Sequence, residues 1–208
     1  IYHILKDAGI KTGMISTVNA IIGDQVLDTG FHVTTPEAPD VHRYLAMMVD
    51  AGITHAVLET TSHGLEQQRV GECAFDIGVV TNITHEHLDY HGSYEAYRAA
   101  KTLLFEALGE VEKKGVQASA ILNLDDQSYE YLPGATKGKQ FTYSIEESTD
   151  FKAEQISHTP EGLTFEISYN GETFPARINL AGEFNASNAL AAFGAAVALG
   201  IEPPVAAV

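Results

Sequence analysis

The stretches His55-Ala-Val-Leu-Glu59 and Ile77-Gly-Val-Val-Thr81 decide the fold class, because each is a short apolar run that ends in a polar residue. Similar runs occupy residues 12–17 and 118–123, and a weaker one lies at 140–143. Continuous apolar strands, rather than alternating ones, are typical of a parallel sheet that is covered on both faces. These segments therefore predict an α/β protein with a doubly wound sheet of mostly parallel strands.

Helical patterns separate these runs. The sequence predicts amphipathic helices at about 39–51 and 93–108, an Ala-rich helix at 185–199, and a first helix at 1–8 that Gly9 ends. We expect all of them to belong to one domain over residues 1–208.

The pattern changes between residues 151 and 180. Apolar and polar residues alternate there, as in Leu163-Thr-Phe-Glu-Ile-Ser-Tyr169, and the pair Asn170-Gly171 follows. This combination is a hairpin signal. We therefore expect a small antiparallel β subdomain at residues 145–182.

The charge balance limits the possible partners. Acidic residues outnumber basic ones by 28 to 12, which gives a formal net charge of −16. Such a chain lacks the clustered Lys and Arg of a generic nucleic-acid surface. A small phosphate-bearing ligand remains compatible, because backbone N–H groups, a metal ion and a few basic side chains suffice to bind it.

Three further features bear on the setting of the chain. No apolar run approaches the roughly 20 residues that a membrane span needs. The single Cys73 has no partner for an internal disulfide, which fits a reducing cytoplasm. The chain opens at Ile1 without a Met or a signal peptide. We expect a fragment of a cytoplasmic protein.

The run His85-Glu-His-Leu-Asp-Tyr-His91 follows one predicted strand, at the edge where ligands of a parallel sheet bind. Three histidines and two carboxylates in seven residues are compatible with a metal site. A metal-dependent hydrolase with an HxHxDH motif is one interpretation, but Tyr90 occupies the place of its last histidine. The alternative is that the histidines cap the helix that begins at Ser93 and line a solvated loop.

Lys101 falls on an apolar helical stripe. Helical spacing places six residues on one face: Tyr94, Tyr97, Lys101, Leu104, Phe105 and Leu108. A lysine there must extend to water, pair with a carboxylate or lose its charge. A neutral amine can react with carbon dioxide to form a carbamate, an anion that can ligate Mg²⁺. The alternative is a lysine whose stem packs while its ammonium group stays in water.

Two more charged residues are candidates. Glu59 ends a predicted strand, and a carboxylate there suits Mg²⁺, although a helix cap or salt bridge would explain it equally well. Arg69 can bind a carboxylate or phosphate through two N–H groups, or form a surface salt bridge.

Thr34-Thr35-Pro36 has the pattern of a helix start, and one of Asn185 and Asn188 could cap the Ala-rich helix.

Five segments occur in order and at regular spacing: Thr34-Thr-Pro36, Leu58-Glu-Thr-Thr-Ser-His-Gly-Leu-Glu-Gln-Gln-Arg-Val70, Thr81-Asn-Ile-Thr-His-Glu-His-Leu-Asp-Tyr-His-Gly92, Tyr97-Arg-Ala-Ala-Lys101 and Gly182-Glu-Phe-Asn-Ala-Ser-Asn-Ala-Leu-Ala-Ala192. This series resembles the central, ATP-binding domain of the Mur ligases, and most of all the MurE type. The resemblance covers nearly the whole chain.

The resemblance implies a role for each matched residue. Lys101 would be carbamylated and would hold Mg²⁺ together with Glu59 and His87. The UDP-MurNAc-dipeptide site would be lined by Thr34, Thr35, Thr61, Gln67 and Arg69, and Asn185 and Asn188 would approach the adenine of ATP. The implied activity is ATP-dependent amide ligation in peptidoglycan precursor synthesis, which adds the third amino acid through an acyl phosphate.

The chain also departs from the family pattern. It contains no GxxxxGK[ST] motif, so the phosphate loop and the strand that carries it are missing, as are the family's N-terminal UDP-binding and C-terminal domains. We therefore expect the fragment alone to be inactive. Another Mur or folylpolyglutamate-type ligase and a non-catalytic binding module are the remaining alternatives.

Overall fold

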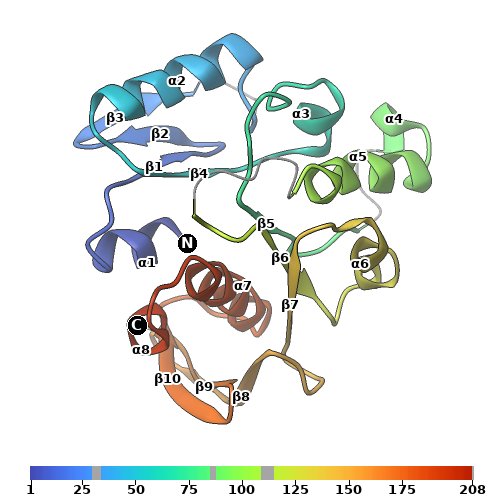
Figure 1. The fold of residues 1–208 in the computed structure, drawn as a ribbon. Helices are drawn as coiled ribbons and strands as arrows, with labels where there is room; N and C mark the ends of the chain where they lie inside the picture. The colour runs from blue at the N-terminus through green and yellow to red at the C-terminus, as the bar shows by residue number, and fades with distance from the viewer. Residues whose placement is uncertain (30–33, 85–87, 109–114, 208) are drawn as a thin grey trace.

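The computed structural model describes residues 1–29, 34–84, 88–108 and 115–207. Within these ranges the chain is built from two mixed sheets and the helices that cover them (Figure 1). No helix in the described part of the chain is long and apolar enough to span a bilayer.

The first sheet has the strand order β3-β2-β1-β4. Its strands are β1 (Thr12–Ile15), β2 (Asn19–Ile22), β3 (Gln25–Asp28) and β4 (His55–Leu58). The strands β1 and β4 run parallel, whereas β1, β2 and β3 pair in antiparallel fashion. The hairpin of β2 and β3 was missed from the sequence, although Gly23-Asp24 between two apolar runs is a turn signal, and Gly23 has a φ of +60°.

The second sheet has the order β10-β9-β8-β7-β6-β5. Its strands are β5 (Ile77–Val79), β6 (Ser119–Asn123), β7 (Lys139–Ser144), β8 (Phe151–Thr159), β9 (Gly162–Tyr169) and β10 (Glu172–Ile178). Neighbouring strands from β5 to β8 run parallel, and β8, β9 and β10 are antiparallel. The predicted α/β class is confirmed, with two sheets in place of one.

The antiparallel strands follow from the alternating pattern. Tyr169 pairs with Glu172 across the turn, where Asn170 and Gly171 have φ values of 51° and 81°. Positive φ at both central residues is what a tight hairpin turn requires, and Asn-Gly supplies it with little strain. Because β8 also pairs with β7, these strands extend the second sheet.

The strands β4 and β5 are both sheet edges, since each pairs with one neighbour. Ala56 is exposed, and Val57, Leu58, Ile77 and Val79 are half-buried. A strand inside a doubly wound sheet would bury these side chains. The predicted apolar strands are therefore present, but β4 and β5 each pair with a single strand in the described part of the chain.

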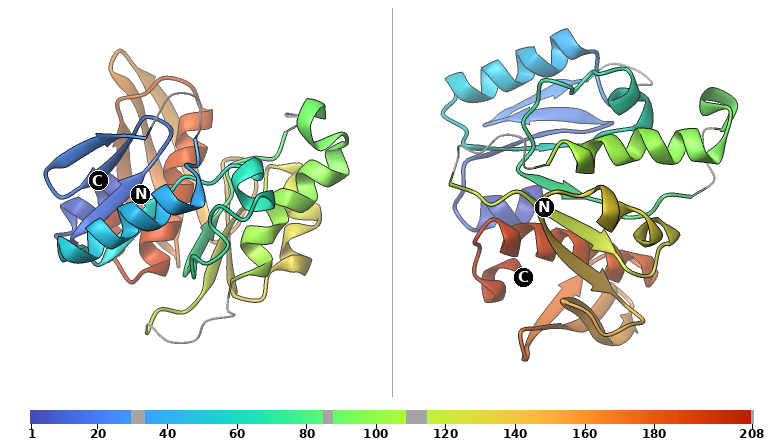
Figure 2. Two further views of the ribbon diagram at one scale, coloured as in Figure 1. Left: turned by 90° about the horizontal axis from the view of Figure 1, so that it is seen from above. Right: turned by 45° about the vertical axis from the view of Figure 1, so that its right-hand side comes forward.

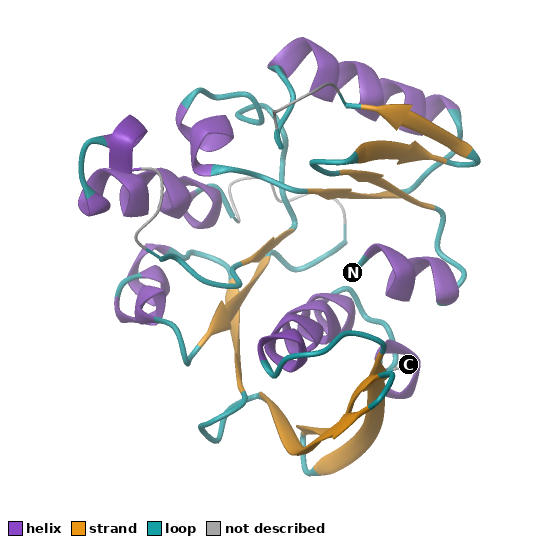
Figure 3. Cartoon of the chain, turned by 180° about the vertical axis from the view of Figure 1, so that it is seen from behind, coloured by secondary structure: helices purple, strands orange, loops and turns teal. Residues whose placement is uncertain are grey.

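The helices in chain order are α1 (Tyr2–Asp7), α2 (Ala38–Asp50), α3 (Ser62–Glu66), α4 (Leu88–His91), α5 (Tyr94–Glu106), α6 (Leu132–Ala135), α7 (Phe184–Ala198) and α8 (Pro203–Ala206), with a 3₁₀ turn at Gln127–Glu130. The helices α2, α5 and α7 lie where the sequence predicts them. Figures 2 and 3 show α2 along the first sheet and α7 inside the curve of the second.

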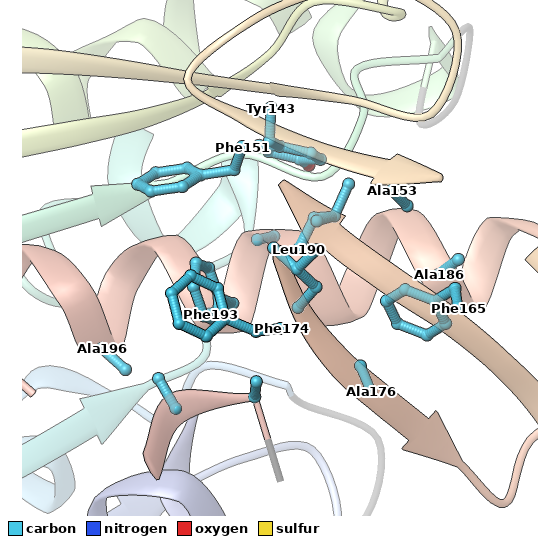
Figure 4. Close-up of a cluster of buried hydrophobic side chains, with 14 of the residues drawn as sticks. Tyr143, Phe151, Ala153, Phe165, Phe174, Ala176, Ala186, Leu190, Phe193 and Ala196 are labelled. Atoms are coloured by element: carbon cyan, nitrogen blue, oxygen red, sulfur yellow. The ribbon is translucent and has the colours of Figure 1, made fainter. Parts of the chain in front are cut away.

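Two apolar cores hold these layers together. The first lies between α7 and the second sheet, where Phe193 packs edge-to-face against Phe151 with ring centroids 5.5 Å apart (Figure 4). The second core joins both sheets to α2, α3 and α5, and includes Ile15, Tyr44 and Phe105. Because the second core spans the two sheets, the ends of β4 and β5 are held on one body.

Tyr143 on β7 brings a polar hydroxyl into the first of these cores. Its side chain is fully buried, and its hydroxyl donates a hydrogen bond of 2.7 Å to the carbonyl of Val80, just after β5. Burial raises the pKa of Tyr143, because the phenolate form would lose its hydration.

Replacing Tyr143 with Phe is expected to lower the free energy of unfolding by about 1–3 kcal/mol, since the Val80 carbonyl stays buried without its donor. In the unfolded chain a tyrosine ionises near pH 10, before the buried one does. The contribution of Tyr143 to stability is therefore constant below about pH 10 and is lost as the pH rises further. Urea unfolding between neutral and alkaline pH measures both effects. An equally steep alkaline loss in Tyr143→Phe would contradict this assignment.

Candidate functional site

Thr35 joins its own segment to the end of β4 and the start of α3. The residue is 1% exposed, and its hydroxyl donates to the Glu59 carbonyl at 3.2 Å and accepts from the Thr61 N–H at 2.9 Å. The Thr61 hydroxyl lies 3.2 Å away and caps α3 by accepting from the Gly64 N–H. Thr34 is half-buried beside it. The Thr34–Thr35 segment is thus fixed to the end of β4 and the start of α3.

Arg69 extends this cluster. Its Nη1 donates to the Thr35 carbonyl at 2.8 Å, and its Nε and Nη2 donate to Gln67 Oε1 at 2.9 and 2.6 Å. Gln67 Nε2 in turn donates to the Tyr90 hydroxyl at 2.7 Å. The guanidinium also pairs with Glu37, at 3.0 Å between Nη2 and Oε1. The side chain of Arg69 is only 13% exposed, so its contacts exceed those of a surface salt bridge.

Gly64 permits this close packing. A Cβ atom on Gly64 would lie 2.8 Å from both Cβ and Cγ2 of Thr35, closer than side chains approach in folded proteins. The backbone of α3 therefore rests directly on Thr35. Contact between α3 and Thr35 therefore requires a glycine at position 64. The sequence alone did not reveal this requirement.

Glu59 and Lys101 are the two described members of the predicted metal set. Glu59 follows β4, and its Oε2 accepts the N–H and the hydroxyl of Thr17 at 2.9 and 3.1 Å. Lys101 is half-buried on α5, with Nζ 5.8 Å from the ring centroid of Tyr97. The predicted apolar stripe is buried at Tyr97, Leu104, Phe105 and Leu108. The third member, His87, lies outside the described residues, as do His85 and Glu86.

The described residues fit Mg²⁺ under one condition. Mg²⁺ takes oxygen ligands, and Glu59 supplies a carboxylate held by Thr17. A lysine ammonium repels a cation, whereas a carbamate on Lys101 would add a second anionic oxygen donor. Among described residues, no group of three His, Cys, Asp or Glu side chains is placed to hold a metal ion. Binding of Mg²⁺ by Glu59 and Lys101 would therefore require a carbamate on Lys101.

Asn185 and Asn188 lie in the first turns of α7. Asn185 Nδ2 donates to the Ala181 carbonyl at 2.8 Å, and Asn188 Nδ2 lies 3.4 Å from Asn185 Oδ1. Neither residue is the N-cap of α7, because Glu183 occupies that position. The two side chains share one face, as their spacing predicts.

Three side chains that the sequence analysis did not select hold the segment after β5. Asn123 Nδ2 donates to the Thr81 carbonyl at 2.6 Å, and Asp126 Oδ1 accepts the Ile83 N–H at 3.2 Å. The Tyr94 hydroxyl donates to the Ile83 carbonyl at 3.1 Å. The available signal was the polar run Asn123-Leu-Asp-Asp126, which follows an apolar strand just as Glu59 does.

The order of the clustered residues along the chain agrees with a known family. Residues 1–196 match the family model of the Mur ligase middle domain. The chain belongs to the Mur ligase family. Two relatives support this assignment in detail. The UDP-N-acetylmuramoyl-L-alanyl-D-glutamate--2,6-diaminopimelate ligase of Geobacillus thermodenitrificans is 40% identical over 200 residues, which are 96% of this chain and 40% of that protein.

The second relative is the UDP-N-acetylmuramyl-tripeptide synthetase of Roseiflexus sp., 38% identical over 95% of this chain and 40% of that protein. A solved structure of a UDP-N-acetylmuramoyl-L-alanyl-D-glutamate--2,6-diaminopimelate ligase aligns with a TM-score of 0.86 and 28% identity, over 99% of this chain and 41% of that one. This Mur ligase chain thus spans about 40% of the length of the relatives it matches.

Proposed function

We propose that this Mur ligase chain is the central domain of a cytoplasmic, ATP-dependent amide ligase that adds the third amino acid to UDP-MurNAc-L-Ala-D-Glu. The observation that carries the proposal is the cluster of Thr35, Thr61, Gln67 and Arg69. These residues come from two separate stretches of the chain and join in one hydrogen-bonded network beside the end of β4. The names of the similar proteins favour this substrate among the family's possibilities.

In this proposal the cluster binds the anionic part of the muramyl substrate. Arg69 is already paired with a carboxylate, that of Glu37, whose side chain is 66% exposed. A substrate carboxylate could take the place of Glu37 at little cost, because one charged pair would replace another. Thr34 and the hydroxyl of Thr61 would add polar contacts, and Asn185 and Asn188 would approach the adenine of ATP.

The metal set supplies the other half of the site. Lys101, carrying a carbamate, would hold Mg²⁺ together with Glu59 and His87, and the ion would neutralise charge on the phosphoryl group. The substrate carboxylate would take the γ-phosphoryl group of ATP to form an acyl phosphate, releasing ADP. The amine of the incoming amino acid would then displace phosphate and form the amide. The role of the protein is to position the reactants and stabilise charge.

The 208-residue chain by itself is expected to bind ATP with a Kd weaker than about 1 mM, which corresponds to about 4 kcal/mol. The reason is that no GxxxxGK[ST] loop is present to bind the phosphates through backbone N–H groups. Calorimetric titration measures the affinity. A longer protein that includes this domain and a phosphate loop is expected to release ADP only when UDP-MurNAc-L-Ala-D-Glu and diaminopimelate or lysine are both present.

Two results would contradict these expectations. Low-micromolar ATP binding by the 208-residue chain would show that other residues bind the phosphates. Absence of amide product from the longer protein, with either amino acid, would favour the non-catalytic binding module.

A further inference from the structure

His91, at the end of α4, is a fully buried imidazole that the proposed reaction does not use. The exposed fraction of its side chain is 0%. Its Nε2 lies 2.9 Å from the hydroxyl oxygen of Ser62, which is itself 1% exposed. Its Nδ1 lies 3.3 Å from Glu66 Oε2, without the geometry of a hydrogen bond. Ser62 and Glu66 are the first and last residues of α3, so one ring contacts both ends of this helix.

The helix α3 needs such support. It has only five residues, and a helix of that length is unstable without tertiary contacts. Its other anchors lie on the opposite side, where Thr61 caps its first turn and Gly64 rests on Thr35. His91 is thus one of the contacts that join α3 to the chain leading into α5, beside the hydrogen bond from Gln67 to Tyr90.

The same ring also contacts α5. The ring centroids of His91 and Tyr97 lie 5.4 Å apart, and the His63 ring of α3 lies 5.2 Å from that of His91. Tyr97 stands one turn before Lys101, whose Nζ is 5.8 Å from the Tyr97 ring. His91 therefore lies between α3, which leads into Gln67 and Arg69, and α5, which carries Lys101.

We propose that His91 is a positioning residue that holds α3 against α5, so that the residues around α3 keep a fixed orientation toward Lys101. The link to substrate rests on the proposed function, whereas the support of α3 does not. The set Ser62, His91 and Glu66 also has the residue types of a hydrolytic triad. Ser62 is inaccessible to a substrate, however, and Nδ1 does not donate to Glu66, so the geometry favours support over nucleophilic catalysis.

Amide hydrogen exchange in His91→Phe tests the support of α3. The phenyl ring keeps the aromatic packing and leaves the Ser62 hydroxyl unpaired. The amides of Leu65, Gln67 and Arg69 bond within or next to α3, and their exchange is expected to accelerate about tenfold to a hundredfold. His91→Gln can keep a polar contact to Ser62, so an intermediate rate is expected. The exposed His42→Phe on α2 is the matched control and should leave all rates unchanged.

The exchange pattern separates support of α3 from a general loss of stability. If His91 stabilised the core as a whole and not α3 in particular, local opening of α3 would leave the contacts of His91 intact. The buried Ile121 amide would then exchange faster in His91→Phe, while Leu65, Gln67 and Arg69 kept their rates. That result would overturn the proposal.

A second measurement tests the link to substrate. In a longer protein that contains this domain, His91→Phe is expected to weaken the Kd for UDP-MurNAc-L-Ala-D-Glu about tenfold or more and leave the Kd for ATP unchanged. Faster exchange of α3 with an unchanged Kd for the muramyl substrate would overturn the link, and with it the placement of that substrate at α3. It would leave the support of α3 by His91 standing.

Discussion

Replacing Lys101 with Met is expected to lower kcat for amide ligation by about 10²–10³-fold or more in a longer protein that contains this domain. Methionine keeps the apolar stem that packs on α5 beside Tyr97, but it has no amine to form a carbamate. The proposed Mg²⁺ site would lose one of its anionic ligands. Steady-state kinetics with ATP and UDP-MurNAc-L-Ala-D-Glu measures the loss, and Lys6→Met on the surface of α1 is the control.

Three further measurements sharpen this prediction. Thermal unfolding should show little change in Lys101→Met, because the stem is retained. Lys101→Arg should be equally inactive, since a guanidinium carries positive charge and forms no carbamate. Added acetate should restore part of the activity of Lys101→Met, because a small carboxylate can occupy the place of the missing anion. Lys101→Met with near-normal kcat would rule out a metal-ligating carbamate.

The second large effect is expected for Gly64→Ala. The new Cβ would stand 2.8 Å from Cβ and Cγ2 of Thr35 and 2.9 Å from its Oγ1. Thr35 has little freedom to yield, because it is buried and its hydroxyl bonds the Glu59 carbonyl and the Thr61 N–H. We expect a loss of about 1–3 kcal/mol in the free energy of unfolding, by urea titration.

The same substitution should separate Thr35 from Thr61 and weaken binding of the muramyl substrate. Gly134→Ala on the short helix α6 is the matched control, since a Cβ there meets no atom within 4 Å. If Gly64→Ala were as stable as Gly134→Ala and bound substrate normally, the Thr35 contact would not matter to the site.

Much of the fold could be predicted from local patterns. The apolar strands and the amphipathic helices α2 and α5 lie where hydrophobic periodicity predicts them, because burial of one face is encoded in neighbouring residues. The turn at Asn170-Gly171 was equally readable, since two positive φ angles in succession favour those residue types. The hairpin of β2 and β3 carried a similar signal at Gly23-Asp24.

The division into two sheets could not be predicted in this way. The apolar run of β4 has the pattern of a strand with neighbours on both sides, yet among the described strands it pairs with β1 alone. Strand pairing joins residues far apart in the chain, such as Thr12 and His55, and no local pattern specifies the partner.

The sequence by itself determined the chemical groups of the candidate site and the elements that carry them. Glu59, Arg69 and Lys101 could be selected by type and spacing, because charges and helical faces are local properties. The roles of the threonines and Gln67 followed from the resemblance to the Mur ligases. Only the tertiary structure decided that Arg69 reaches the Thr35 carbonyl, that Gly64 lies against Thr35, and that the side chain of His91 is fully buried beside Ser62. Those contacts arise when β4, α3 and α5 pack together, because burial and hydrogen-bond partners depend on which distant segments exclude water from one another.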